Sequence, residues 1–405
     1  MAQLQLRHQL QLLQGGKDFF PALIEAIDAS VHEVRMETYI FNPVGSGALV
    51  AAALERAALR GVKVCLVMDG VGTPALDPHW CSRFQAAGVL WQIFAPMGRF
   101  GLLIPSRWRR LHRKLCVVDG QVAFCGGINV LDDFFDPNHG ALQLPRLDFA
   151  VRVIGPLVRE VHAVQAQFWW RLQAARTAQQ IDLRAAWLAL RQAVALTAPS
   201  QLPSPALAVP AAGAMARAAL VLRDNLRHRA QIERAYRKAI GEATHEIIIA
   251  NAYFLPGRKL RRSLTHAAQR GVRVRLLLQG RYEYFMQYHA ARPVYGVLLA
   301  AGVEIHEYSV SFLHAKVAVI DSRWATVGSS NLDPLSLLLA REANVVVEDP
   351  AFAHELRAQL EQAIEHGGVR VDPQTYANRS WRLRLLDRVA FGLMRMALFL
   401  TGNRY

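Results

Sequence analysis

The sequence has 405 residues, of which 52% are apolar, so it is long enough for two domains of ordinary size that each bury a core. Its formal charge of +15 predicts polyanionic partners, and either a nucleic acid or an anionic membrane fits that charge. A solvated basic surface that only reflects an arginine-rich composition is the alternative.

The N-terminal segment lacks the uninterrupted apolar stretch of a signal peptide or a membrane span. The four cysteines show no metal-ligand spacing, and three of them stand in apolar, strand-like runs. These features predict a cytoplasmic protein that is free to touch the inner leaflet of the membrane.

Elements of the first part of the chain recur about 200 residues later. The strand-like run HEVRMETYIFNP from His32 is echoed by HEIIIANAYFLPG from His245. Residues 53–70 and 264–280 both read as a helix that ends at glycine and is followed by a buried strand. This order predicts an α/β protein made of two tandem α/β/α domains with mixed, largely parallel sheets.

The expected domains are residues 1–196 and 215–375. A linker rich in Pro and Ala, residues 197–214, separates them. Residues 376–405 form a basic, amphipathic C-terminal segment, for which we expect either a helix in the membrane interface or a helix packed on the second domain.

A spaced triplet occurs once in each domain, within residues 112–129 and 314–331. Of the 47 Lys and Arg residues only six are Lys, and two of those six stand in the triplets. A Gly-Gly or Gly-Ser pair and an Asn follow each triplet at the same distance. The repeated residues are His112, Lys114, Asp119 and Asn129 in the first copy and His314, Lys316, Asp321 and Asn331 in the second.

His and Lys two residues apart face the same side of an extended chain, so each pair can point into one pocket. A neutral imidazole is a nucleophile toward phosphorus, and a protonated one is an acid toward a leaving oxygen. The Lys residues, Asn129 and Asn331 offer donors to the oxygens of a phosphoryl group. The chemistry therefore requires neither a metal nor another cofactor.

A histidine nucleophile needs a partner that fixes its tautomer. The sequence offers Asp148 and Glu342, which align when the halves are superposed on Pro156 and Pro350. Asp119 and Asp321 follow the Lys residues at an odd separation, which predicts a place at the strand end. A direct role in the chemistry and a structural role in a turn are both open for them.

The two triplets resemble the duplicated HKD signature of the phospholipase D superfamily at His, Lys, Asp, Gly and Asn. The resemblance implies two phospholipase D-like domains related by a pseudo-two-fold axis, and transfer of a phosphatidyl or phosphoryl group through a phosphohistidine. Carried onto this sequence, it implies that one of His112 and His314 is the nucleophile and the other the general acid. We expect His112 as nucleophile and His314 as acid, although the pseudo-symmetry supports the reverse order almost equally well.

Within that superfamily the chain is most similar to bacterial cardiolipin synthases of the B type, through the strings ATVGSSNLDPLS, EANV, ANAYFLPG and VLRDN. Ala340 departs from the family pattern, in which an Asn is expected. The resemblance implies a phosphatidyltransferase that moves a phosphatidyl group from a phospholipid such as phosphatidylglycerol to the glycerol hydroxyl of a second phosphatidylglycerol.

Two other activities remain alternatives: a phospholipase D hydrolase, which uses water as acceptor, and a phosphodiesterase or nuclease. A catalytically silent scaffold is disfavoured because neither motif is degraded. The expected partners are phospholipid substrates and an anionic membrane surface, without nucleic acid, and the expected location is peripheral, on the cytoplasmic side of the inner membrane. The sequence does not predict the oligomeric state.

Overall fold

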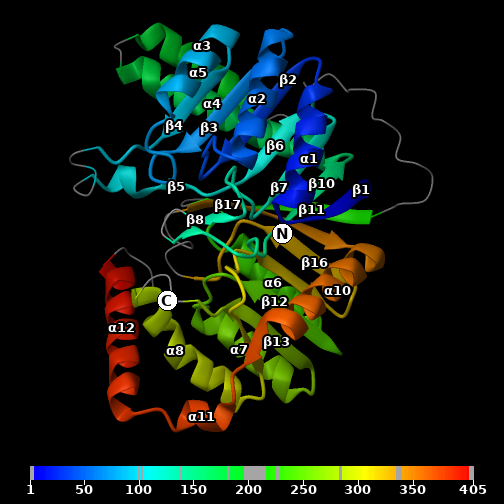
Figure 1. Ribbon diagram of the computed structural model, residues 1–405, viewed down its shortest axis with the longest axis vertical. Helices are drawn as coiled ribbons and strands as arrows, with labels where there is room; N and C mark the ends of the chain where they lie inside the picture. Colours follow the sequence, from blue (N-terminus) through cyan, green and yellow to red (C-terminus); the bar gives the residue numbers. More distant parts are fainter. Residues whose placement is uncertain are drawn as a thin grey trace.

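The computed structural model describes residues 4–98, 101, 104–136, 139–179, 182–195, 216–224, 228–281, 285–333 and 340–400. The expected linker, residues 197–214, lies outside these ranges, and so does the end of the C-terminal segment, residues 401–405. Figure 1 follows the chain from the first half, with α1, α2 and α3, to the second half, with α7, α8 and α12.

The first half contains β1 (Gln5–Gln14), α1 (Gly15–Asp28), β2 (Glu33–Thr38), α2 (Ser46–Leu59), β3 (Lys63–Asp69), α3 (Pro78–Ala87), β4 (Leu90–Phe94), the 3-10 helix η2 (Pro105–Trp108), β5 (Arg110–Leu111), β6 (Leu115–Val118), β7 (Val122–Gly126), β8 (Phe135–Asp136), β9 (Gly140–Ala141), β10 (Phe149–Ile154), α4 (Leu157–Gln179) and α5 (Leu183–Ala195). The second half contains β11 (Ala216–Arg223), α6 (Gln231–Glu242), β12 (Glu246–Asn251), α7 (Arg258–Gln269), β13 (Arg273–Gln279), α8 (Phe285–Ala300), β14 (Glu304–Tyr308), β15 (Lys316–Ile320), β16 (Trp324–Gly328), β17 (Ala340–Glu348), α10 (Pro350–Gly367), β18 (Gly368–Arg370), α11 (Pro373–Ala377) and α12 (Trp381–Leu400).

The main sheet has a strand order that is nearly a palindrome. It runs β4-β3-β2-β6-β7-β10-β1 through the first half and continues β11-β17-β16-β15-β12-β13-β14 through the second, with β18 added at the far edge. The equivalent strands β1 and β11 pair antiparallel at the centre and join the two halves. The duplicated, pseudo-symmetric α/β arrangement expected from the sequence is therefore confirmed.

Parallel pairing is less common in this sheet than the sequence analysis predicted. Within each half it is confined to β2-β3-β4 and β12-β13-β14, where a helix connects successive strands. The motif strands β6-β7 and β15-β16 instead form hairpins, and a short hairpin turn can only join antiparallel strands. The sheets are mixed, as expected, but they are not largely parallel.

The helix ends predicted at glycine are present in both halves. After α2, Gly61 has a φ of 88°, and after α7, Gly271 has a φ of 90°. A side chain is strained in this left-handed conformation, whereas glycine adopts it readily and ends the helix. The buried strands β3 and β13 follow directly, so the local pattern positions the strands beside each motif.

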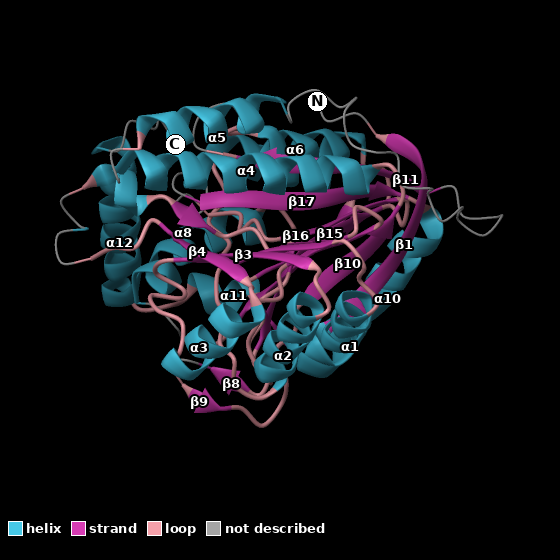
Figure 2. Ribbon diagram, turned by 90° about the horizontal axis from the view of Figure 1, so that it is seen from above, coloured by secondary structure: helices cyan, strands magenta, loops and turns pink. Residues whose placement is uncertain are grey.

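One hydrophobic core is shared by the two halves. It combines Val117 and Val151 of the first half with Val317 and Val345 of the second, and the inner faces of α4 and α10 pack against it. Strands β7 and β10 lie against β16 and β17 in this region. Figure 2 shows the strands as a central layer with helices on both sides. Because the core is common to both halves, it fixes how one motif faces the other.

Within the described ranges, no helix combines the length and the apolar character that are needed to cross a membrane.

Candidate active site

Each motif histidine lies in an extended segment at the start of a motif hairpin. His112 and Lys114 stand between β5 and β6, and His314 stands two residues before Lys316, which is the first residue of β15. The sequence analysis placed these pairs on strands. The structure places them at the entrance of β6 and β15, and Lys316 pairs there with Asn251 of β12.

The carboxylates that hold the histidines come from the opposite halves. Nδ1 of His112 lies 3.0 Å and 3.1 Å from the two carboxylate oxygens of Glu342, which is on β17. Nδ1 of His314 lies 2.6 Å from Oδ2 of Asp148, which precedes β10. In both rings Nε2 is therefore the nitrogen left for a substrate. The sequence identified all four residues, but it did not show that the pairs cross between halves.

The backbone repeats the same crossed arrangement. The N–H of His112 donates to the carbonyl of Arg341, at 3.0 Å, and the N–H of His314 donates to the carbonyl of Leu147, at 2.9 Å. Each histidine is thus tied through both backbone and side chain to adjacent residues of the other half. A shift of one half against the other would disturb both pairs at once.

The two lysines lie beneath the histidines. Lys114 is 5% exposed and Lys316 is completely buried, whereas the side chains of His112 and His314 are 15% and 25% exposed. Each Lys Nζ donates to the carbonyl oxygen of the histidine two residues before it. The charges of both lysines act on both imidazoles, so the two motifs form one shared site.

The two imidazoles differ in their electrostatic surroundings. Burial lowers the pKa of His314 well below its ordinary value, and the positive charges of Lys316 and Lys114 act in the same direction. Burial also lowers the pKa of His112, but the negative charge of Glu342 opposes this effect. His314 is therefore held in the neutral form more strongly than His112.

The two carboxylates differ as well. Burial raises the pKa of Asp148 to about 6, although Lys316 acts to lower it. Burial acts to raise the pKa of Glu342 too, but attraction to His112 and other contacts outweigh it, so the pKa of Glu342 is lowered. Asp148, with its raised pKa, thus holds its negative charge less firmly than Glu342, whose pKa is lowered.

The residue after each motif glycine accounts for part of this difference. Ser329 donates its hydroxyl to the carboxylate of Glu342. The equivalent residue, Gly127, lies so close to Asp148 that an added Cβ would come within 2.2 Å of a carboxylate oxygen. Glycine is therefore required beside Asp148, and the hydroxyl of serine stabilises the negative charge of Glu342.

Asp119 and Asp321 lie at the far ends of the motif strands, in the hairpin turns. The carboxylate of Asp119 accepts three backbone N–H bonds, each 2.8 Å long, from residues 31–33. The carboxylate of Asp321 accepts backbone N–H bonds from residues 244–246. Both residues have positive φ, 51° and 49°, which Asp tolerates better than most residues. Of the two roles left open by the sequence, these bonds support the structural one.

Asn129 and Asn331 follow β7 and β16 and are nearly buried, with 7% and 3% exposure. The side-chain oxygen of Asn129 accepts the N–H of Ile40 at 3.1 Å, which leaves its NH₂ group as the donor for a ligand. Contact with substrate phosphate remains our proposal for both residues.

Two contributors were missed by the sequence analysis. The ring of Tyr39 lies 5.0 Å from that of His112, and Nζ of Lys114 lies 5.5 Å from the Tyr39 ring centroid. The repeat did not single out Tyr39, because it stands seven residues after His32 and its equivalent in the second half is Ala252, seven residues after His245. Arg146 acts on both Asp148 and His314 electrostatically, and no spacing in the sequence indicated it.

Among the described residues, no group of three or more His, Cys, Asp and Glu side chains is placed to hold a metal ion. Positive charges that act on the two histidines include those of Lys114 and Lys316, and that of Arg146 at His314.

The comparisons with known proteins agree on one family. The family model described as "Cardiolipin synthase, PLD-like domain" matches residues 23–144 and 236–364, together more than half of the chain. Cardiolipin synthase B of Salmonella typhi is 37% identical over 397 residues, which cover 98% of this chain and 90% of that protein. Cardiolipin synthase B of Escherichia coli K12 is 36% identical with the same coverage.

Two solved structures share the fold at low sequence identity. A phosphatidylserine synthase of Haemophilus influenzae Rd KW20 aligns with a TM-score of 0.66 at 14% identity, over 97% of this chain and 94% of that one. A polyphosphate kinase of Porphyromonas gingivalis aligns with a TM-score of 0.55 at 14% identity, over 96% of this chain and 53% of that one. With two matched domains and similarity over nearly its whole length, the chain belongs to the cardiolipin synthase family of phospholipase D-like proteins.

Proposed function

We propose that this protein is a cardiolipin synthase, a phosphatidyltransferase of the phospholipase D type that uses phosphatidylglycerol as donor and as acceptor. The observation that carries the proposal is the crossed site, in which two histidines, each held by a carboxylate of the other half, lie above two buried lysines. The similarity to cardiolipin synthases over nearly the full length supports the choice of lipid substrates.

In the first step, Nε2 of one histidine attacks the phosphorus of phosphatidylglycerol. A P–N bond forms, the P–O bond to the headgroup glycerol breaks, and the other histidine gives its proton to the departing glycerol oxygen. Lys114 and Lys316, with the amide groups of Asn129 and Asn331, stabilise the negative charge on the phosphoryl oxygens. The product of this step is a phosphatidyl-histidine.

In the second step, the headgroup hydroxyl of another phosphatidylglycerol attacks the phosphatidyl-histidine. The histidine that acted as acid is now neutral and takes the proton of this hydroxyl, while the P–N bond breaks and returns the first histidine to its neutral form. The released product is cardiolipin, and the proton balance is restored. Asp148 and Glu342 act as positioning residues that fix the tautomer of each ring.

The surroundings of the rings favour His314 as the nucleophile and His112 as the acid, which reverses the order expected from the sequence. A nucleophile must be neutral, and His314 has the more strongly lowered pKa. An acid must hold a proton, and although burial lowers the pKa of His112, the negative charge of Glu342, which accepts the hydroxyl of Ser329, opposes this shift. A bound phosphodiester anion would stabilise that proton further.

The function is tested by mass spectrometry of lipids after the purified protein is incubated with phosphatidylglycerol vesicles, with His112→Ala and His314→Ala as controls. We expect cardiolipin and free glycerol from the wild type and neither from the variants. Phosphatidic acid alone would identify a hydrolase. Absence of any lipid turnover would contradict the proposal and direct attention to other phosphodiesters, including nucleic acid.

The order of the histidines is tested with a diester that carries a p-nitrophenyl leaving group, which departs without help from an acid. We expect His112→Ala to retain a burst of p-nitrophenol and to accumulate the phosphohistidine, because only the acid is missing. His314→Ala should show no burst, because the nucleophile is missing. The opposite result for the two variants would restore the order expected from the sequence.

The proposed place of action is the cytoplasmic side of the inner membrane, where the protein binds peripherally to anionic lipids. The formal charge of +15 supports attraction to such a surface.

A further inference from the structure

The C-terminal helix α12 has two apolar faces, one buried against the domain and the other exposed. Its inner face packs on the second half through Ala390 and Met394, which are buried, and through Asp387, which is 3% exposed. Asp387 is held at 2.8 Å by Nδ1 of His289 on α8 and at 3.0 Å by Arg379. The inner face of the helix is therefore packed on the second half, which is one of the two arrangements expected from the sequence.

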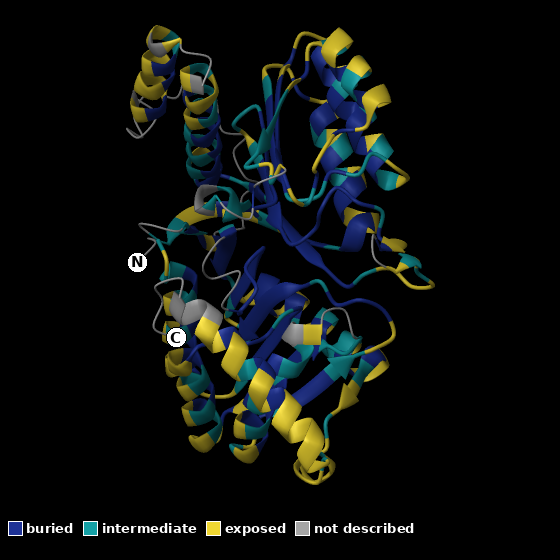
Figure 3. Ribbon diagram, turned by 90° about the vertical axis from the view of Figure 1, so that its left-hand side faces the viewer, coloured by how far each residue is buried: buried dark blue, intermediate teal, exposed yellow. Residues whose placement is uncertain are grey.

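The outer face of α12 is also apolar, yet it is exposed. Trp381, Leu385 and Val389 are spaced four residues apart and so lie along one side of the helix, with exposures of 65%, 53% and 50%. Within residues 381–396 the other large apolar side chains that are exposed are Leu383, Leu386, Leu393 and Met396. Figure 3 shows α12 as a largely exposed helix on the outside of the molecule. A contiguous exposed patch of this kind marks an interaction surface.

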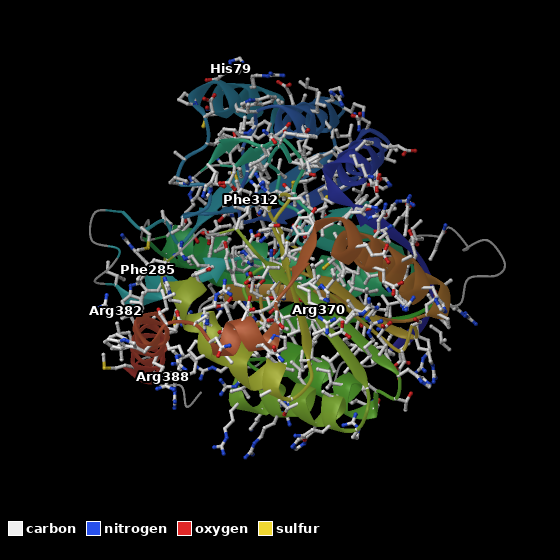
Figure 4. The ribbon with its side chains drawn as sticks, turned by 60° about the horizontal axis from the view of Figure 1, so that its bottom comes forward. His79, Phe285, Phe312, Arg370, Arg382 and Arg388 are labelled. Atoms are coloured by element: carbon white, nitrogen blue, oxygen red, sulfur yellow. The ribbon has the colours of Figure 1, made fainter. Side chains whose placement is uncertain are left out.

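The charges beside this face all have the same sign. The helix carries Arg382, Arg384, Arg388 and Arg395, and Asp387, the one acid among residues 381–396, faces inward. In Figure 4 Arg382 and Arg388 project from different sides of α12 toward the outside of the molecule. An apolar strip flanked by arginines is complementary to a bilayer that contains anionic lipids. A second copy of the same face would bring like charges together.

The helix also connects this surface with the active site. The side chain of Met394 lines a pocket with Tyr288 and Tyr295 of α8 and with Tyr253 and Gln279. The side-chain oxygen of Gln279 accepts the N–H of Leu313, which is the residue before His314. The inner face of α12 is thus linked through this pocket and Gln279 to the residue before His314.

We propose that the outer face of α12 is the surface by which the protein docks on an anionic lipid bilayer. Because α12 packs on α8, this docking brings the second half, which carries His314, against the membrane surface. The inference deepens the proposed function and rests on it for the identity of the lipid that enters, but the docking itself requires no catalysis.

The test compares two triple variants of the full chain that remove the same three residue types. One is Trp381→Ser/Leu385→Ser/Val389→Ser on α12, and the matched control is Trp187→Ser/Leu190→Ser/Val194→Ser on α5, whose residues are similarly exposed at 55%, 50% and 67%. Both are assayed by co-sedimentation with phosphatidylcholine vesicles that contain phosphatidylglycerol. Thermal unfolding confirms that both variants fold.

We expect the α12 variant to lose vesicle binding by about tenfold or more, because three interfacial side chains are removed, and the α5 variant to bind like the wild type. Equal losses in both variants, or no loss in the α12 variant, would overturn the proposal. So would a wild-type dimer, observed by sedimentation without vesicles, that the α12 variant alone abolishes, because that result would assign the face to a second copy.

The experiment also separates docking from catalysis. The α12 variant should turn over monomeric, short-chain phosphatidylglycerol at the wild-type rate and lose activity only on vesicles. Loss on the monomeric substrate as well would overturn the docking role. If the wild type binds vesicles through α12 but forms no lipid product, the proposed function fails while the docking surface stands.

Discussion

At the scale of single residues, the site contains ionisable side chains that the fold buries away from water, which disfavours their charged forms. Lys114 illustrates this, because burial and the charge of Lys316 lower its pKa to about 7. The carboxylates of Glu342 and Asp148 act in the opposite direction and limit the shift. The lysine is thus poised to gain its full charge when a phosphate anion enters the site.

The lowered pKa of Lys114 predicts a pH-dependent stability. In the unfolded chain the amine stays protonated up to its ordinary pKa, whereas in the folded protein it loses its proton above about pH 7. The unfolded state binds more protons in this window, so the stability of the wild type relative to Lys114→Met should rise with pH, by at most about 1.4 kcal/mol per pH unit. Urea unfolding at pH 7, 8 and 9 measures this difference. A constant difference would contradict the lowered pKa.

At the scale of elements, the two ends of each motif hairpin have different functions. The entrance of β6 or β15 presents His and Lys to the site, while the turn at the other end places Asp119 or Asp321 against the backbone where β2 or β12 begins. The spacing between Lys and Asp, which is the same in both copies of the triplet, therefore reflects the length of a strand. The Asp fixes that strand against its neighbour.

The two roles considered for Asp119 predict different results for Asp119→Ala. Because the substitution leaves three backbone N–H groups without their acceptor, we expect the free energy of unfolding to fall by about 2–4 kcal/mol. We also expect the folded variant to keep kcat within a few-fold of the wild type. Chemical denaturation and initial rates at low temperature measure the two quantities. A variant with normal stability and abolished kcat would show that Asp119 takes part in the chemistry.

The sequence predicted the residues of the site better than their arrangement. His112, Lys114 and their counterparts follow from a repeated spacing, and Asp148 and Glu342 follow from alignment of the halves. The crossing of the pairs could not be predicted, because it depends on how the shared core seats one half on the other. The joining of β1 to β11 was missed for the same reason, since strand pairing over such a distance leaves no local pattern.

At the scale of the whole molecule, the active site exists only when both halves are in place. Each half supplies the histidine of its own motif and a carboxylate that contacts the histidine of the other motif. The central pairing of β1 with β11 and the shared core hold this arrangement. Neither half contains its motif histidine together with the carboxylate that holds that histidine.

Double-mutant cycles should reveal the crossed pairs. The effects on kcat/KM of His112→Gln and Glu342→Gln, or of His314→Gln and Asp148→Asn, should be far from additive, because each pair acts as a unit. The effects of Glu342→Gln and Asp148→Asn together should be nearer to additive, since each carboxylate touches a different ring. The measurement is kcat/KM, from initial rates on phosphatidylglycerol, for the wild type, the single variants and the double variants. Strong coupling of the two carboxylates without coupling inside the pairs would contradict the geometry.

The palindromic strand order bears on how such an enzyme can evolve. A single half could form the same antiparallel β1–β11 contact with an identical copy of itself, and the resulting homodimer would hold two crossed pairs that symmetry forces to be the same. Joining the two copies in one polypeptide removes that restriction. In this chain the copies have diverged to Asp148 with Gly127 on one side and Glu342 with Ser329 on the other. Gene fusion thereby allows two ancestrally equal histidines to specialise for different steps of one reaction.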